Sequence, residues 1–272
     1  MKRVLTFLLV VAAVTGVSGA HGQKGGPSQV LLGGQGVVSP DGKTRYVALS
    51  TGTQTIVSFV QVKSGQVLRW RQLPGYFGVP VISLDGTTEG ISRDGRKLVL
   101  ATPSGGTSTQ FALIDTKTLR LRRIGLRGIW SYDAISPDGS LLYLIQYSGL
   151  GSATPAYRVR AYDVAARRML ARPVVDPENG ERLMRGWSVT RKTTSDGRWA
   201  YTLYAREKGQ PFVHALDTTK RRALCVDLPL KLEQSRQMGL RLTLRADRML
   251  DVRDGGRTVA TVDMRRFVVD KH

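Results

Sequence analysis

The chain has 272 residues, with 41 lysines and arginines against 21 acidic residues, which gives a formal net charge of +20. Such a charge attracts polyanions and anionic surfaces, and the length suits one large all-β domain. The single cysteine, Cys225, excludes an intramolecular disulfide. No stretch approaches the roughly 20 apolar residues that a membrane-spanning helix needs.

Residues 1–20 have the pattern of a secretory signal peptide. Lys2 and Arg3 precede an apolar run over 4–14, and small residues at 18–20 supply a cleavage site. We therefore expect an exported protein, secreted or associated with the cell envelope; an uncleaved N-terminal anchor is the alternative. Residues 21–29 are Gly-rich and polar, as in a flexible leader, so folded structure is expected over 30–270.

A turn followed by a strand recurs along the folded part. The clearest copy is Ser136-Pro137-Asp138-Gly139, before an apolar strand over 141–147. Asp-Gly favours a hairpin because Gly takes positive φ without steric cost and the Asp carboxylate accepts hydrogen bonds from backbone N–H groups. Equivalent Asp-Gly pairs, each before a strand, begin at Asp41, Asp94 and Asp196.

Each unit has a second half, in which a strand ends at a turn and another strand follows. In the first unit Gly65 serves this turn, and in the other four the strand ends on an aspartate. These aspartates are Asp115, Asp163, Asp217 and Asp263. A degenerate last copy of the first turn lies at Asp247, and the five first-turn aspartates are 53, 44, 58 and 51 residues apart. A period near 50 with four strands in each unit is the signature of β-propeller blades.

The repeated unit resembles the YVTN-type and WD-repeat-like β-propellers of bacterial exported proteins. The resemblance rests on Ser-Pro-Asp-Gly at 136–139, Leu-Tyr-Leu at 142–144 and the strand and turn at 111–116, and it covers nearly all of the chain after the leader. It implies an all-β fold, a β-propeller of about five four-stranded blades. The family includes ligand-binding, scaffold and enzyme members, so the resemblance implies no particular activity.

Two features of such a propeller are left open. A closed ring must join its first and last blades, and residues 29–32 are a candidate for the closing strand. Residues 230–238 lack turn residues and contain good helix formers, so we expect a turn or two of helix between the fourth and fifth blades.

Residues suited to catalysis are scarce. The histidines, His21, His214 and His272, are far apart in the sequence and predict neither a triad nor a metal cluster. The repeated aspartates occupy equivalent turns, which indicates backbone hydrogen bonding rather than acid–base chemistry. We therefore expect no catalytic residues, no metal and no cofactor. His214 is expected to be structural or at the surface, and Cys225 to be buried, with an intermolecular disulfide as the alternative.

One set of residues favours ligand binding. Aromatic residues stand beside glycine in the connections into successive inner strands, and two of these connections carry a basic neighbour. In a propeller the connections share one face, where rings and guanidinium groups can stack on or pair with a ligand; wedging between blades is the alternative. The predicted ligand-binding residues are Tyr76, Arg127, Trp130, Tyr132, Arg185 and Trp187.

The sequence therefore predicts a non-catalytic binding or interaction module that uses one propeller face. Its expected partner is a protein, a saccharide or an anionic cell-envelope polymer, and a membrane surface is a further candidate. The first alternative is a hydrolase or lyase that uses carboxylates, with or without a divalent metal, at the central channel. Non-specific nucleic-acid binding comes third, because the charge favours it whereas export and the lack of a nucleic-acid motif do not.

Overall fold

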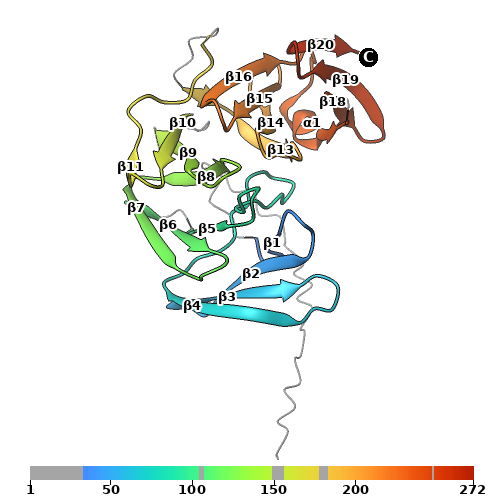
Figure 1. Cartoon of the computed structure of the whole chain (residues 1–272). Helices are drawn as coiled ribbons and strands as arrows, with labels where there is room; N and C mark the ends of the chain where they lie inside the picture. Colours follow the sequence, from blue (N-terminus) through green and yellow to red (C-terminus); the bar gives the residue numbers. More distant parts are fainter. Residues whose placement is uncertain (1–32, 104–106, 149–155, 178–182, 247) are drawn as a thin grey trace, which may run out of the picture.

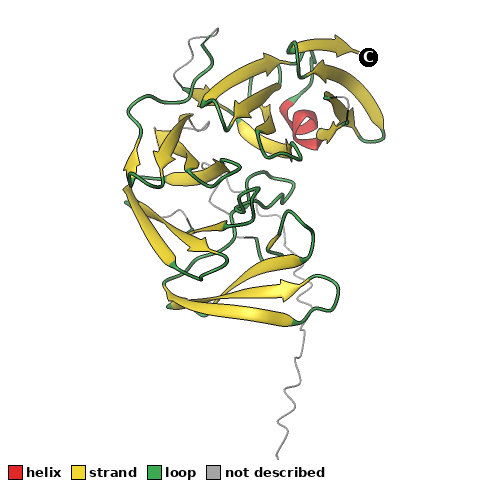
Figure 2. Ribbon diagram, in the orientation of Figure 1, coloured by secondary structure: helices red, strands yellow, loops and turns green. Residues whose placement is uncertain are grey.

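The computed structural model describes residues 33–103, 107–148, 156–177, 183–246 and 248–272, and Figure 1 shows their arrangement. The predicted signal peptide, the leader, the candidate closing strand at 29–32 and Asp247 lie outside the described residues. Almost all regular structure is β (Figure 2). Within the described part of the chain, no helix is long and apolar enough to cross a membrane.

Five antiparallel sheets follow one another along the chain, and we number them in that order. The first contains β1 (Val37–Val38), β2 (Thr44–Ser50), β3 (Gln54–Gln61) and β4 (Val67–Pro74), and the second β5 (Lys97–Ala101), β6 (Ser108–Asp115) and β7 (Leu121–Arg127). The third contains β8 (Trp130–Ile135), β9 (Leu141–Ser148), β10 (Ala156–Asp163) and β11 (Arg168–Met169), with β12 (Met184–Arg185) also paired to β10. The fourth contains β13 (Trp187–Thr193), β14 (Trp199–Ala205), β15 (Phe212–Asp217) and β16 (Arg222–Asp227), and the fifth β17 (Arg241–Leu244), β18 (Met249–Asp254), β19 (Arg257–Asp263) and β20 (Val268–Lys271).

These sheets coincide with the five predicted repeat units. The second sheet differs from the expected four strands, because an isolated bridge between Ile91 and Leu98 stands in the place of its innermost strand. A short helix, α1 (Gln234–Gly239), lies between the fourth and fifth sheets, which confirms the expected helical turn there.

The repeated Asp-Gly turns are held by local hydrogen bonds. At Asp138, the Ser136 hydroxyl donates to Oδ1 at 2.6 Å and the backbone N–H of Ser140 donates at 3.0 Å. The following glycine, Gly139, has φ 71°, a conformation that suits a residue without Cβ. In the fourth sheet Thr194, rather than the neighbouring Ser195, supplies the hydroxyl. The expected structural role of the turn aspartates is therefore confirmed.

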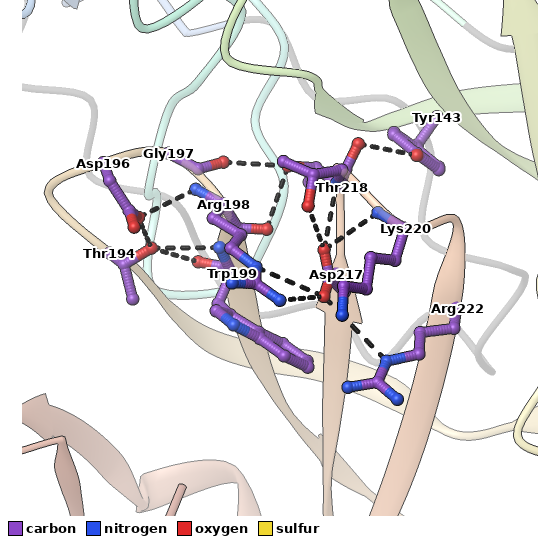
Figure 3. A network of polar contacts seen from close by, with 11 residues as sticks. Tyr143, Thr194, Asp196, Gly197, Arg198, Trp199, Asp217, Thr218, Lys220 and Arg222 are labelled. Atoms are coloured by element: carbon purple, nitrogen blue, oxygen red, sulfur yellow. Dashed lines mark hydrogen bonds and ion pairs between the residues drawn. The ribbon is translucent and has the colours of Figure 1, made fainter. Parts of the chain in front are cut away.

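The two turns of a repeat unit meet at one end of their sheet, as Figure 3 shows for the fourth sheet. The Thr218 hydroxyl donates to the carbonyl of Gly197 at 2.9 Å, and Arg198 pairs with Asp217 at 2.9 Å. Tyr143 on β9 donates to the carbonyl of Thr218 at 2.8 Å. This end of the fourth sheet is thereby bonded to the third sheet.

Four hydrophobic clusters lie between consecutive sheets. Val57 packs with Leu98 between the first and second sheets, and Leu203 with Val252 between the fourth and fifth; two further clusters join the second to the third and the third to the fourth. Within the described residues, no cluster combines the fifth sheet with the first. Figure 1 accordingly shows an arc that runs from the first sheet at the bottom to the fifth at the upper right.

Candidate functional site

The connection between the first and second sheets folds into a hairpin over residues 81–88, which we call the central hairpin because it lies inside the arc (Figure 1). Its tip repeats the turn chemistry of the sheets, since the Ser83 hydroxyl donates to Asp85 at 2.8 Å. The backbone N–H groups of Leu84 and Asp85 donate to the carbonyls of Ser188 and Val189 at 2.9 and 3.2 Å. The central hairpin therefore attaches to β13, the innermost strand of the fourth sheet.

A buried ion cluster lies next to the central hairpin. The Arg191 side chain, 2% exposed, donates to the carbonyl and the carboxylate of Asp133, whose side chain is fully buried. It also donates to the Thr202 hydroxyl at 2.8 Å and lies 3.4 Å from a carboxylate oxygen of Glu89. Thr193 donates to the other Glu89 oxygen at 2.5 Å. One guanidinium thus connects the third sheet, the fourth sheet and the segment that follows the central hairpin.

The cluster holds two carboxylates and one guanidinium, which determines the direction of the pKa shifts. Burial raises the pKa of Glu89, and Asp133 adds to this effect, although Arg191 and Thr193 oppose it. Burial works against the charge on Arg191, but Asp133 and Glu89 outweigh it and raise its pKa. Arg191 therefore remains charged, and Glu89 takes up a proton at a higher pH than an ordinary glutamate does.

A pocket of about 320 Å³ opens beside this cluster, at the end of the sheets where the Asp-Gly turns lie. Its walls come from the first four sheets, and the Glu89 side chain, 21% exposed, borders it. Other wall residues include Val37, Arg93, Tyr132, Ile135 and Ser195. A concave, largely apolar site with a few convergent polar groups is suited to a small ligand or to a side chain of a partner.

A second hollow of about 550 Å³ lies between the second and third sheets, and we call it the basic groove. Its single bordering carboxylate, Asp115, is paired with Lys97 at 2.8 Å. The other charged groups along it are basic. They are Arg120, Arg122 and Arg167. Arg123 also borders the groove, but its guanidinium points to the first sheet, where it donates to the carbonyl of Pro74.

The six predicted ligand-binding residues are placed as follows. Trp130 and Tyr132 are 5% and 3% exposed and belong to the cluster between the second and third sheets. The indole N–H of Trp130 donates to the carbonyl of Arg127 at 2.8 Å, which brings these two residues together. Of the six, Tyr132 borders the pocket beside Glu89. Tyr76, Arg127 and Arg185 are exposed, Trp187 is half-buried, and these four border neither hollow.

His214 and Cys225 face each other on β15 and β16, with 3.6 Å between His214 Nδ1 and Cys225 Sγ. His214 is 1% exposed, and burial lowers its pKa to about 4. A histidine that is neutral at physiological pH and buried among strands is structural, as expected. Cys225 is partly buried, and its backbone N–H donates to Asp176 at 2.7 Å. No group of three or more His, Cys, Asp or Glu residues in the described ranges is arranged to hold a metal.

Sequence reasoning missed Glu89, Asp133, Arg191 and the central hairpin. A signal for the hairpin was present, because Ser83-Leu84-Asp85-Gly86 copies the repeat turn nine residues before Asp94. Nothing local marks the ion cluster, whose members are more than 40 residues apart in the chain.

No family model and no curated protein sequence matches this chain. Among solved structures it is similar to an oligogalacturonate lyase in complex with manganese, with a TM-score of 0.51 and 12% identity over 87% of this chain and 63% of the other. TolB from Acinetobacter baumannii gives a TM-score of 0.44 and 13% identity over 80% of this chain and 50% of the other, so this chain spans about half of that protein. The Cps50 (Swd1) β-propeller domain from Myceliophteria thermophila gives a TM-score of 0.48 and 14% identity, over 87% of this chain and 67% of the other.

These likenesses, all under 25% identity, concern the fold alone. The likeness with a TM-score above 0.5, that to the oligogalacturonate lyase, supports a β-propeller fold together with the five consecutive sheets and the hydrophobic clusters between them.

Proposed function

We propose that this protein is an exported, non-catalytic binding module of the YVTN-like bacterial type. Its partner is an anionic polymer or protein of the cell envelope, held in the basic groove between the second and third sheets. The observation that carries this proposal is the convergence of four basic side chains, those of Lys97, Arg120, Arg122 and Arg167, on one groove that contains a single, already paired carboxylate.

The positive charge of the basic groove is available to a ligand. Arg122 donates to the backbone carbonyl of Val164 in the third sheet, which fixes its side chain without neutralising it. Arg120 and Arg167 are exposed, and within the described residues neither takes part in an ion pair. One positioned guanidinium group beside two unpaired ones suits a ligand with several carboxylates, sulfates or phosphates.

A ligand with repeated charges fits better than a single small anion. The equivalent interval between the third and fourth sheets holds another hollow, of about 240 Å³, bordered by Arg172, Lys220 and Arg221. The repeat therefore places basic side chains at successive intervals along the outside of the arc. An extended polyanion can contact more than one interval, and the gain in affinity grows with each contact.

Binding to poly-L-glutamate and dextran sulfate tests this proposal. Replacing Arg120 and Arg167 with Ser should weaken binding by roughly tenfold or more and reduce the slope of log K against log salt by about 2, because two counterion-releasing contacts disappear. The matched control replaces Arg257 and Arg265, two exposed arginines of the fifth sheet region, and removes the same charge. Equal losses in both variants would show that only net charge matters and would reject the groove.

A second candidate function is a hydrolase or lyase at the pocket beside Glu89. It is favoured by one observation: two carboxylates converge there, and burial raises the pKa of the one that borders the pocket. Turnover of anionic polysaccharides that is lost in Glu89→Gln, while polyanion binding persists, would support an enzyme. Elemental analysis of the purified protein is the second test, since a stoichiometric divalent ion would also favour it.

A further inference from the structure

The first sheet has one face packed on the second sheet and one face that no other sheet of the described residues covers. Along β3 the burial alternates, with Val57 and Phe59 buried and Ile56 half-exposed. Leu49 lies opposite Ile56, and Trp70 opposite Ser58, so the uncovered side continues across β2, β3 and β4. We call this surface the free face; its apolar residues are Val47, Leu49, Ile56, Val60, Val67 and Trp70.

The free face is exposed and nearly free of charge. Leu49, Val67 and Trp70 are 56%, 52% and 60% exposed, which is unusual for large apolar side chains gathered on one sheet. The neighbouring Arg69 points to the opposite side, where it donates to the carbonyl of Lys117 in the second sheet at 3.0 Å. Arg45, at the inner edge of the free face, donates to the carbonyl of Gln35 at 2.9 Å.

The fifth sheet does not supply a matching surface. Its side away from the fourth sheet carries the row Thr243, Asp251, Thr261 and Asp270, which are paired across the four strands. Arg241 and Arg253 face each other on the next row. Packing this polar side against Trp70 and Leu49 would bury charged groups on an apolar surface, which is costly. If the ring closed within one chain, the apolar free face would therefore pack against polar and charged side chains.

We propose that a second copy of this chain covers the free face, with the two free faces stacked about a two-fold axis. Packing of sheet on sheet is already how the four hydrophobic clusters hold the molecule together. In a two-fold arrangement the same surface of both chains meets, so that surface must complement itself. An apolar surface with few charges meets this requirement, because it brings no like charges together. Two chains of charge +20 repel each other in any orientation, but contact through this face brings few charged groups together, so it is opposed less than contact through a basic surface.

Light scattering coupled to gel filtration in 0.3 M NaCl tests the proposal on the full chain as it is exported. We expect the wild type to show the mass of two chains, and Trp70→Ser to show the mass of one chain at the same concentration. Val67→Ser, a milder change on the same face, should raise the dissociation constant at least tenfold. Circular dichroism and thermal unfolding check that both variants fold.

Tyr76→Ser is the matched control, because Tyr76 is an exposed aromatic residue, 47% accessible, outside the free face. It should leave the dimer intact. A wild-type protein that stays at the mass of one chain up to its solubility limit would overturn the proposal. So would a dimer that tolerates both Trp70→Ser and Val67→Ser, or assembly beyond two chains.

Discussion

Arg191 connects more parts of the molecule than its position in the middle of a strand suggests. Its guanidinium bonds Asp133 on the third sheet and Thr202 on the fourth, and it lies beside Glu89. Because both Arg191 and Asp133 are withdrawn from water, neither can be hydrated if the other is removed. The cluster is therefore a structural support of the pocket as well as its main source of charge.

Replacing Arg191 with Met should destabilise the protein by about 3–5 kcal/mol, because the buried Asp133 carboxylate then lacks its counter-charge. Urea unfolding measures this loss. The matched control is Arg236→Met, which removes an exposed partner of Asp254 and should cost less than about 1 kcal/mol. Equal costs for the two variants would contradict the interpretation of Arg191.

His214 gives the fold a defined dependence on pH. Its pKa is about 4 when folded, against about 6.5 in an unfolded chain. Asp133 and Asp176 favour its protonation and Arg191 opposes it, but burial is the largest influence. Between these two pKa values the unfolded chain binds a proton that the folded chain does not. Stability from this residue is therefore complete above about pH 6.5 and is lost as the pH falls toward 4.

From pH 7 to pH 5, His214 should account for a loss of about 2 kcal/mol in the free energy of unfolding. Comparing the wild type with His214→Gln at both pH values isolates this contribution, because the other titrating groups are common to both proteins. The variant should lose less stability than the wild type over this interval. An identical loss in both would mean that His214 does not titrate as its burial implies.

At the scale of the elements, the second turn of each unit uses a left-handed residue. Leu119, Arg167, Arg221 and Phe267 each lie four residues after the turn aspartate and have φ between 54° and 60°. The first sheet has Gly65 at this position, with φ 71°. The same turn is thus built with and without glycine, and the non-glycine copies carry backbone strain.

Arg221→Gly should therefore leave the protein as stable or stabilise it by up to about 1 kcal/mol, because glycine adopts this conformation without strain. Arg221→Val should destabilise it by about 1–2 kcal/mol, since a β-branched residue is poorly accommodated there. Thermal unfolding of the two variants measures the difference. If valine proved the more stable of the two, the backbone conformation would not be the deciding factor.

At the scale of the whole molecule, several arginines join neighbouring sheets. Arg69 and Arg71 of the first sheet donate to backbone carbonyls of the second, and Arg122 of the second donates to a carbonyl of the third. Arg93, in the turn before β5 of the second sheet, donates to the carbonyl of Pro40, in the turn between β1 and β2 of the first sheet. A carbonyl accepts the hydrogen bond without cancelling the charge, so these contacts leave the net charge of +20 in place.

Salt should consequently stabilise the protein. Raising NaCl from 0.05 to 0.5 M shortens the Debye length from above 10 Å to a few ångströms, which screens the repulsion among the basic side chains. We expect the thermal midpoint to rise by a few degrees, because the hydrogen bonds to carbonyls and the buried Arg191 cluster are screened less. A midpoint that falls with salt would show that attractive surface pairs outweigh the repulsion.

The sequence by itself determined the repeat and its turns. The contacts that hold Asp138 lie within a few residues of it, and so does the left-handed glycine, so composition and spacing are enough to predict them. The tertiary structure alone decided that Arg191 meets Asp133, that the central hairpin attaches to β13, and that Trp70 lies on a face that no other described sheet covers. These depend on which sheets come together and at what angle, and the contacts span 58 residues or more for the first two. Local preferences fix a turn, but long-range packing fixes which surfaces are buried.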